Sequence, residues 1–491
     1  MNWRRGGTMK KKLLVSLLLT AALICACALA TGAVGTLADD GIYEISTAEE
    51  LYAIATGVAA NAKTDEGTYV RDCAYRLMND IDMSGISAQT PIGTAKYAFR
   101  GSFDGQNHTI SGIELSNSAG NCALFGRVAK NGAVPATIEN LIIEGNVTSS
   151  GSNVGGLIAQ VADSAIVRNC TNWCNVSYTG NVIDTTKKHG TGGIVGRIVA
   201  ASGTLEIADC TNTGSISGSK GVGGILGRSD VTTGSITVTG CTNRGVVTAT
   251  ISDASGCADV GGIAGFDYGE KNAATRHLFS GCTNFGTVAF AKLEDYDFSS
   301  FTKGFGFQGV GGIIGRTQTN GIEVTGCYNG GKVTSDGQDA NGTSGDSYAM
   351  VIVGKSPAAP KNSNNYYIPG AGAMNSVKAI AVDLTQESTT AAIWQDGNAT
   401  VRYITRLTVD DAAAVESYGI MIAKVDDKVD AKYAVLTDSF EGTETTYAVD
   451  LVGIPEVARD INIYAWAYVN LAGGVQIVLP VAPVTVNGII G

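Results

Sequence analysis

The sequence is poor in proline and in charged residues, and each shortage excludes a class of protein. Only 8 of its 491 residues are proline although 65 are glycine, so the glycine excess is neither collagen-like nor part of a proline-rich disordered tract. Charged residues make up 16% of the chain, against about 25% in average soluble proteins. Because 44% of the residues are apolar, the chain can bury a large core, and its length allows two or three domains.

Histidine is also scarce. His108, His189 and His277 are the only three, and none lies in a Gly-x-Ser-x-Gly or His-Glu-x-x-His pattern. Those patterns position the nucleophile of serine hydrolases and the metal of zinc hydrolases. We therefore expect no catalytic residue, no metal site and no cofactor.

Positive charge is in deficit. The chain has 34 Lys and Arg against 45 Asp and Glu, which gives a formal net charge of −11. Binding to phosphate backbones or to anionic lipid depends on a concentrated positive field. We expect neither a nucleic-acid partner nor a peripheral membrane role.

The N-terminal segment has the pattern of an export signal. Three lysines at 10–12 precede a largely apolar stretch over 13–30, and small residues follow. This order predicts a secretory signal peptide, with cleavage after Ala30 or after Ala38. We assign 1–38 to the signal and expect a secreted or cell-surface protein with no membrane span after its removal. An uncleaved anchor is the alternative, since the apolar stretch just reaches a spanning length.

Two short phrases recur five times in the middle of the chain. The first is Val-Gly-Gly-Ile-x-Gly or a close variant, and the second is Cys-Thr-Asn or, once, Cys-Tyr-Asn. The first phrases begin at Val154, Thr191, Val222, Val260 and Val310, and the second phrases begin at Cys170, Cys210, Cys241, Cys282 and Cys327.

The repeat predicts a solenoid. The shortest period, from Cys210 to Cys241, holds three strand-like runs with Gly, Asn or Ser between them and no helical periodicity. Such a period fits one coil of a three-sided parallel β-helix. Gly223 and Gly224 would form tight corners because glycine tolerates positive φ. A β-propeller is the alternative, but its blades need four strands.

The flanking segments differ from the repeats. A capping box at Thr47 and Glu50 opens an amphipathic helix, so 39–98 is expected to cap the solenoid, which spans 99–370. No cysteine follows Cys327, no Gly-Gly-Ile phrase follows the one at Val310, and the segment 356–360 breaks the repeat pattern. We expect a linker over 371–399 and a small antiparallel, immunoglobulin-like β-sandwich over 400–491.

Several of these segments resemble bacterial surface proteins with GLUG-type repeats. The similar segments are residues 45–51 (ISTAEEL), 79–85 (NDIDMSG), 99–112 and the five Gly-Gly phrases. The resemblance implies a right-handed β-solenoid on an exported protein of adhesin type. Some members are joined to zinc peptidases, whose His-Glu-x-x-His motif is absent here, so that activity is not carried over.

Two columns of equivalent residues are expected inside the solenoid. The five repeated cysteines should stack as buried, reduced thiols, because parallel side chains hold their Cβ atoms too far apart for disulfides. Disulfides between neighbouring coils are the alternative. The asparagines that follow should form a ladder of stacked amides at one corner. These asparagines are Asn172, Asn212, Asn243, Asn284 and Asn329.

Two groups of side chains are candidates for contact with a glycan. Arg197, Arg228 and Arg316 follow three of the Gly-Gly phrases and could align as an outward basic stripe, although a purely structural role at the corner is simpler. Tyr464, Trp466 and Tyr468 share one face of a predicted strand. That face forms an exposed platform if the aliphatic face is the core, and otherwise packs inside the sandwich.

These patterns predict an exported, non-catalytic, adhesin-like binding protein whose partner is an extracellular glycan or protein. Inserts over 249–258, 289–307 and 335–346 are candidate contact loops. A polysaccharide lyase or glycoside hydrolase on the same scaffold is one alternative, and an inert structural stalk is another.

Overall fold

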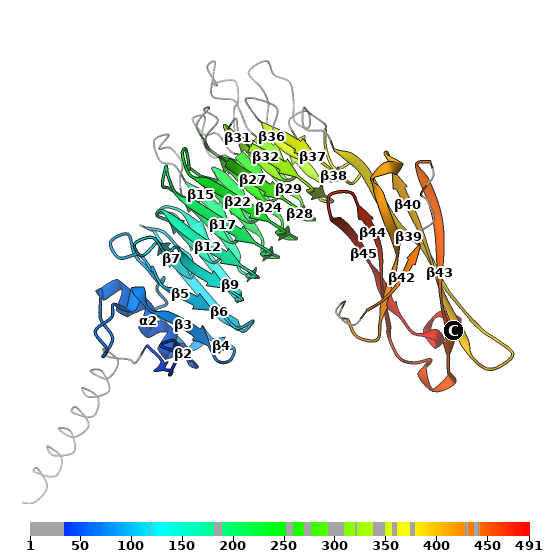
Figure 1. Cartoon of the computed structure of the whole chain (residues 1–491), viewed down its shortest axis with the longest axis horizontal. Coiled ribbons are helices and arrows are strands. Elements are labelled where there is room, and N and C mark those ends of the chain that lie inside the picture. The colour runs from blue at the N-terminus through cyan, green and yellow to red at the C-terminus, as the bar shows by residue number, and fades with distance from the viewer. Residues whose placement is uncertain are drawn as a thin grey trace, which may run out of the picture.

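The computed structural model describes residues 34–118, 120–180, 189–251, 259–269, 276–292, 309–319, 322–336, 349–355, 361–373, 379–426, 428, 431–436, 440 and 442–491. These residues are mostly β-strand. Successive coils stack into a solenoid, and a separate β unit follows at its C-terminal end (Figure 1).

The coils contribute strands to four stacked sheets within the described residues, and the ladders between coils are parallel, apart from the antiparallel pairing of β1 with β2. Sheet 1 consists of β1 (Thr36–Leu37), β2 (Tyr43–Ile45), β3 (Ala74–Leu77), β5 (Ser102–Asp104), β8 (Ala136–Glu139), β12 (Ser164–Arg168), β17 (Thr204–Ala208), β22 (Ser235–Thr239), β27 (Arg276–Ser280), β32 (Ile322–Thr325) and β37 (Lys361–Ser363). Sheet 2 consists of β4 (Ile81–Asp82), β6 (Thr109–Asn117), β9 (Ile142–Ser149), β13 (Thr171–Asn172), β14 (Asn175–Tyr178), β18 (Thr211–Asn212), β19 (Ile216–Gly218), β23 (Thr242–Asn243), β24 (Val247–Ile251), β28 (Thr283–Asn284), β29 (Val288–Lys292), β33 (Tyr328–Asn329), β34 (Val333–Ser335) and β38 (Tyr366–Tyr367).

The other two sheets carry the Gly-Gly phrases. Sheet 3 consists of β10 (Val154–Gly155), β15 (Gly190–Gly192), β20 (Gly221–Gly223), β25 (Asp259–Gly261), β30 (Gly309–Gly311) and β35 (Ala349–Met350). Sheet 4 consists of β7 (Phe125–Val128), β11 (Ile158–Val161), β16 (Val195–Ile198), β21 (Leu226–Ser229), β26 (Ala264–Asp267), β31 (Ile314–Thr317) and β36 (Val353–Lys355).

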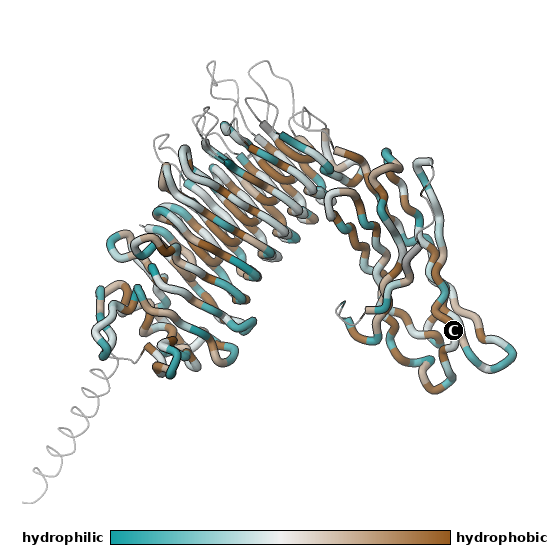
Figure 2. The backbone as a smooth tube through the Cα atoms, viewed as in Figure 1, coloured by the Kyte–Doolittle hydropathy of each residue, from teal (hydrophilic) through white to brown (hydrophobic). Residues whose placement is uncertain are grey.

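The repeats stack in register, as the sequence predicts. The first residues of the five Gly-Gly phrases pair one after another through sheet 3, from Val154 to Val310. One continuous apolar core lies inside the coils, visible as brown segments along the rungs in Figure 2. These ladders confirm a parallel β-solenoid.

The prediction of three sides is wrong. Each Gly-Gly phrase passes from sheet 3 to sheet 4 instead of forming one strand, so β20 ends at Gly223 and β21 begins at Leu226. A coil therefore presents four strand-bearing faces. The break is too short to be visible in a pattern of apolar residues.

The predicted reason for the two glycines is also wrong. Gly223 and Gly224 are absent from the residues with positive φ. Glycine is required here because there is no room for a side chain: a Cβ on Gly224 would lie 2.2 Å from the carbonyl oxygen of Gly262 on the next coil. The positive-φ corner lies instead just before each repeated cysteine, as at Asp209 and Gly240, which are residue types that tolerate this conformation.

The N-terminal segment closes one end of the solenoid and also contributes strands to it. Helix α2 (Ala48–Ala60) has the predicted capping box at Thr47 and buries Leu51, Ile54 and Val58 in the solenoid core. However, β2, β3 and β4 already belong to the sheets, so coiling starts well before residue 99. Strand β1 lies inside the segment assigned to the signal peptide, so a boundary at residue 38 would remove a strand of sheet 1. Residues 1–33 lie outside the described residues.

The C-terminal unit is the predicted antiparallel sandwich. One sheet consists of β39 (Ile380–Ile393), β40 (Ala399–Val409) and β43 (Glu444–Ile454), and the other consists of β42 (Lys432–Leu436), β41 (Val415–Ala423), β44 (Ile463–Leu471) and β45 (Val475–Val484). Helix α3 (Val486–Ile490) and the short 3-10 turns η5 (Ala412–Ala414) and η6 (Glu456–Ala458) complete it. A shared apolar core lies between the two sheets.

The expected linker over 371–399 contains a long strand. The start of β39 pairs in parallel with β38 of the solenoid, and the rest of β39 pairs antiparallel with β40. Tyr328 and Tyr366 of the last coils join the sandwich core, and the Tyr366 hydroxyl donates to the carbonyl oxygen of Ala472 at 3.0 Å. The two units thus share a strand and a packed contact.

Candidate functional site

The repeated asparagines occupy the interior and bond to one another. Asn172, Asn212, Asn243, Asn284 and Asn329 are fully buried. Each Nδ2 of the first four donates to the Oδ1 of the next asparagine at 2.7–2.8 Å. Each Nδ2 also donates to the backbone carbonyl two residues further along its own chain, as from Asn243 to Gly245 at 2.9 Å. The row is structural, because the ladder and these carbonyls occupy the amide donors.

The asparagines also explain the Gly-Gly phrases. A Cβ on Gly224 would lie 2.4 Å from the side chain of Asn243, and the same clash recurs in the other four coils. The second glycine of one phrase and the asparagine of the other therefore face each other across the coil. The two phrases recur together because the asparagine of the second phrase leaves no room for a side chain at the second glycine of the first phrase.

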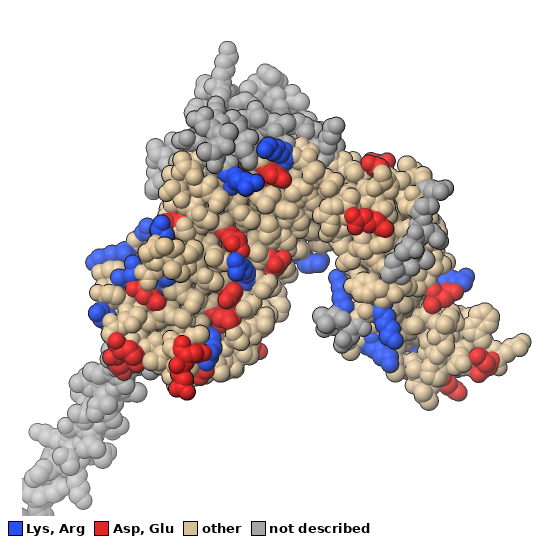
Figure 3. Space-filling model, in the orientation of Figure 1, with Lys and Arg blue, Asp and Glu red and all other residues tan. Residues whose placement is uncertain are grey.

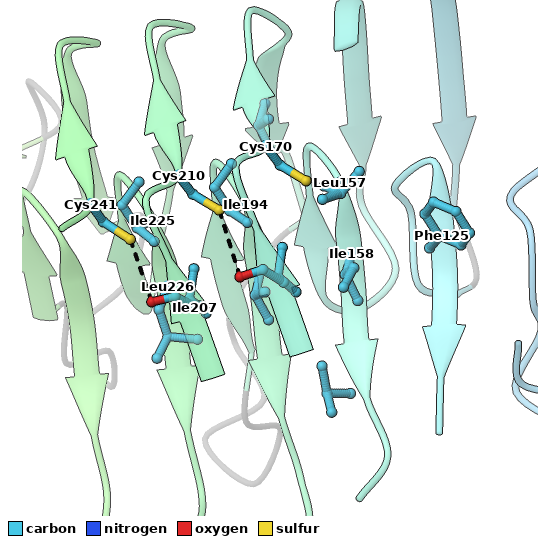
Figure 4. Packing of buried hydrophobic residues seen from close by; sticks show 14 of the residues in the cluster. Phe125, Leu157, Ile158, Cys170, Ile194, Ile207, Cys210, Ile225, Leu226 and Cys241 are labelled. Atoms are coloured by element: carbon cyan, nitrogen blue, oxygen red, sulfur yellow. Dashed lines mark hydrogen bonds between the residues drawn. The ribbon is translucent and has the colours of Figure 1, made fainter. Parts of the chain in front are cut away.

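The repeated cysteines are buried free thiols (Figure 4). The Sγ of Cys241 donates to the carbonyl oxygen of Thr239 at 3.3 Å and, on the preceding coil, to that of Ile207 at 3.6 Å. Burial raises the pKa of the Cys170 and Cys241 thiols, because a thiolate would lose its hydration. Their reduced state in solution stays a prediction.

The predicted arginine stripe lies on sheet 4, where ladder pairing aligns its members. Arg197 pairs with Arg228, Arg228 with Phe266, and Phe266 with Arg316. Towards the N-terminus, Gln160 pairs with both Arg197 and Arg127. We call this row, Arg127 to Arg316, the outward column.

Most of the outward column is engaged within the protein. Asp230 accepts from Arg197 Nε at 2.7 Å and from Arg228 Nη2 at 2.8 Å. Burial alone would raise the pKa of Asp230, but attraction and hydrogen bonds from Arg228 and Arg197 hold it below its ordinary value. The Arg228 and Arg316 guanidinium groups lie 4.5 and 5.3 Å from the Phe266 ring centroid. Only 11–19% of these arginine side chains is exposed, so the middle of the column stabilises the corner.

The three aromatic residues of β44 do not form an exposed platform. Trp466 and Tyr468 are 5% and 0% exposed and pack with Met421 and Ala423 of β41 in a small separate cluster. The opposite, aliphatic face of β44 belongs to the sandwich core. Tyr464 and Trp466 do reach the wall of a cavity of about 250 Å³ that Asp426 also lines.

A larger cavity, of about 490 Å³, lies at the N-terminal end of the outward column, and we call it the Arg71 pocket. Arg71 comes from η1 (Val70–Asp72), Lys96, Tyr97 and Arg100 come from the segment between η2 (Met83–Gly85) and β5, and Arg127 comes from β7. Its lining residues are Arg71, Lys96, Tyr97, Ala98, Arg100, Arg127, Ala129, Ala162 and Asp163.

The Arg71 pocket is basic, in contrast to the chain as a whole. Four cationic side chains and one carboxylate, that of Asp163, line it. Figure 3 shows Lys and Arg side chains gathered on the side of the solenoid near β7 and α2. On a chain with a net charge of −11, this is a local positive field suited to an anionic ligand.

Sequence reasoning missed Arg71, Lys96, Tyr97 and Arg100 as pocket residues. They lie in the segment that was expected only to cap the solenoid, and no repeat aligns them. Arg127 carries a signal, since its Gly-Arg sequence matches Gly196-Arg197 and Gly227-Arg228. The other side chains come together only through the fold.

Two kinds of feature are absent from the described residues. These residues contain no group of three or more His, Cys, Asp and Glu side chains placed to hold a metal ion. No helix among them has the length and apolar character that a membrane crossing needs. Of the candidate contact loops, residues 252–258, 293–307 and 337–346 lie outside the described residues, and their first residues, 249–251, 289–292 and 335–336, lie at or directly after the ends of β24, β29 and β34.

Comparison with known proteins gives distant matches. No family model matches the chain. Halomucin from Haloquadratum walsbyi is 31% identical over 183 residues, which cover 35% of this chain and 2% of halomucin. This chain thus spans a small fraction of the length of that relative. A crystal structure from Bacteroides ovatus, provisionally described as an immunoglobulin A1 protease, aligns with a TM-score of 0.40 at 19% identity, covering 60% of this chain and 77% of that one.

Proposed function

We propose that the chain is an exported, non-catalytic binding protein of the cell surface or the extracellular medium, and that its ligand is an anionic extracellular glycan. The observation that carries this proposal is the Arg71 pocket, where four cationic side chains converge on an otherwise acidic chain. The predicted export signal and the resemblance of the sequence to GLUG-type surface proteins support the location. The adhesin-like role follows from the combination of a rigid solenoid and a charged site at one end.

The solenoid supports such a role because its interior is filled by an apolar core and by the asparagine ladder. The asparagine ladder holds the coils from Asn172 to Asn329 in register, so the arginines of sheet 4 in these coils keep fixed positions relative to one another. Fixed charges bind without losing side-chain freedom on contact, which favours affinity.

The proposal is tested on the purified chain with an array of acidic and neutral glycans and with an assay for release of reducing sugar. We expect acidic glycans to be retained, neutral glycans not to be, and no sugar to be released. Binding should weaken as salt rises, since the attraction is electrostatic. Released sugar would instead establish the glycan-degrading alternative, and a chain that retains no glycan would be the inert stalk.

A further inference from the structure

Arg71 is held in place by aromatic rings. Its guanidinium carbon lies 4.4 Å from the ring centroid of Tyr69 and 5.4 Å from that of Tyr97. Lys63 lies 4.8 Å from the Tyr69 ring, and Lys96 lies 4.9 Å from the Tyr97 ring. Cation–π contacts use the face of a guanidinium and leave its N–H edge for hydrogen bonds. The rings therefore orient Arg71 before any ligand arrives.

Two arginine nitrogens of the pocket have no acceptor within the part of the chain that the structure describes. Arg71 Nη1 and Arg127 Nε are shielded from solvent and find no hydrogen-bond partner among the described residues. Arg127 donates through Nη1 to the carbonyl oxygen of Ala95, which fixes the end of its side chain. A shielded donor without an acceptor is unfavourable, so a rotation of either side chain that brings its nitrogen to an oxygen atom of a ligand in the pocket would be favoured.

The carboxylates near the pocket are already engaged. Asp72 accepts from Arg100 Nε and Nη2 at 2.7 and 2.6 Å, and lies 3.7 Å from Arg71 Nε. Asp163 accepts from the backbone N–H groups of Lys130 at 2.7 Å and Ser164 at 2.5 Å. Four cations thus face two carboxylates, which leaves a net positive charge of about two for an incoming anion.

We propose that the Arg71 pocket binds a carboxylate or sulfate group carried by a sugar unit of an extracellular polysaccharide, with Arg71 and Arg127 donating to its oxygens. This inference rests on the proposed function and names the group that is recognised. Arginine is suited to planar, multi-atom recognition of such oxyanions. The volume of about 490 Å³ accommodates a small group and the ring that bears it.

The position of the pocket leaves room for a linear polymer to continue beyond it. The outward column leads away from Arg127 along the solenoid axis, and its rungs are about 4.8 Å apart. A chain that leaves the pocket along sheet 4 would meet Gln160 on the next coil and then the edges of Arg197 and Arg228, which are 15% and 11% exposed and hydrogen-bonded to Asp230. The pocket would then supply the main contact with one unit, and the remaining units would lie outside it along the solenoid surface.

The test is a titration of the full chain by calorimetry at two salt concentrations. The probes are a heparin hexasaccharide for sulfate, an oligogalacturonate of the same length for carboxylate, neutral maltohexaose, and an acidic peptide of glutamates. The pocket variants are Arg71→Gln and Lys96→Gln. Lys96→Gln should leave the folding of the chain unchanged, because the Lys96 side chain is exposed. Arg168→Gln on sheet 1 is the matched control, since it removes the same charge from an exposed arginine of the same solenoid.

We expect the sulfated or the carboxylated oligosaccharide to bind, and we expect maltohexaose not to bind. Arg71→Gln should weaken binding about tenfold to hundredfold, which is the effect of losing a hydrogen bond to a charged group. Lys96→Gln should weaken it about threefold, and Arg168→Gln should leave it within about twofold. The binding of the two oligosaccharides relative to each other decides between sulfate and carboxylate.

The other outcomes separate the two proposals. If an acidic oligosaccharide binds and both pocket variants bind as tightly as the wild type, the inference about the pocket is wrong and the proposed function stands. If the glutamate peptide binds as tightly as the oligosaccharides, a polysaccharide is not the preferred ligand and the inference is again wrong. If none of the probes binds to the wild type, both proposals are overturned.

Discussion

Replacing Asn243 by alanine should lower the free energy of unfolding of the solenoid far more than replacing its sequence neighbour Thr242 by alanine. The side chain is fully buried in the middle of the asparagine ladder. It accepts from Asn212 at 2.8 Å, donates to Asn284 at 2.8 Å and donates to the carbonyl oxygen of Gly245 at 2.9 Å. Asn243→Ala removes all three hydrogen bonds and leaves a donor and two acceptors buried without these partners.

The magnitude follows from the cost of those three groups. A buried polar group left without a partner costs about 1–3 kcal/mol, so three of them imply a loss of about 3 kcal/mol or more in the free energy of unfolding. In a solenoid this loss falls on the coils next to the change, because each coil contacts only its neighbours. The sandwich should be unaffected.

The measurement is hydrogen exchange of the full chain by mass spectrometry, read separately for peptides of the solenoid and of the sandwich. Peptides of β18, β23 and β28 should exchange faster in Asn243→Ala, and peptides of β44 and β45 should not change. Thr242→Ala is the control, since Thr242 is on the same strand and only half-buried. Equal exchange in the two variants would refute the argument that the amide ladder stabilises the coils.

Three further predictions follow from the same coils. Gly224→Ala should cost about 3 kcal/mol or more, since its Cβ would lie 2.2 Å from a backbone oxygen, whereas Gly85→Ala, with no atom within 4 Å, should be tolerated in the same urea titration. Cys241 should resist alkylation in the folded chain and react fully after denaturation without a reductant, and a thiol that stays blocked in the unfolded chain would indicate a disulfide. Because the pKa of Asp230 is lowered in the folded state, its ionised form stabilises the fold at pH values above the ordinary carboxyl pKa of about 4. This contribution is lost as the pH falls through the pKa that Asp230 has in the folded state. Asp230→Asn should therefore be less stable at pH 7 but should lose less stability than the wild type between pH 4 and pH 2, and parallel pH profiles of the two proteins would contradict this.

The sequence predicts the solenoid well because its interior repeats. Equivalent residues such as Asn212 and Asn243 recur at positions that the ladder pairs directly, so the alignment of phrases in the sequence is the alignment of residues in space. The number of faces is not predicted, because the corner inside each Gly-Gly phrase depends on contact with the neighbouring coil. The strand β39 is not predicted either, since it pairs with the solenoid at one end and with β40 along the rest, and these partners come from two different units.

The position of the Arg71 pocket follows from the same constraint that makes the repeats so regular. Within the repeated coils, the second glycine, the cysteine and the asparagine each contact an adjacent coil, so a change at one of them is tolerated only if its neighbours change too. Even the outward arginines there are tied to Asp230 and Phe266. The N-terminal coils lack both phrases and are therefore free of this requirement. A site built from several different side chains is therefore expected in the coils outside the repeats. Arg71, Arg100 and Arg127 converge in those coils.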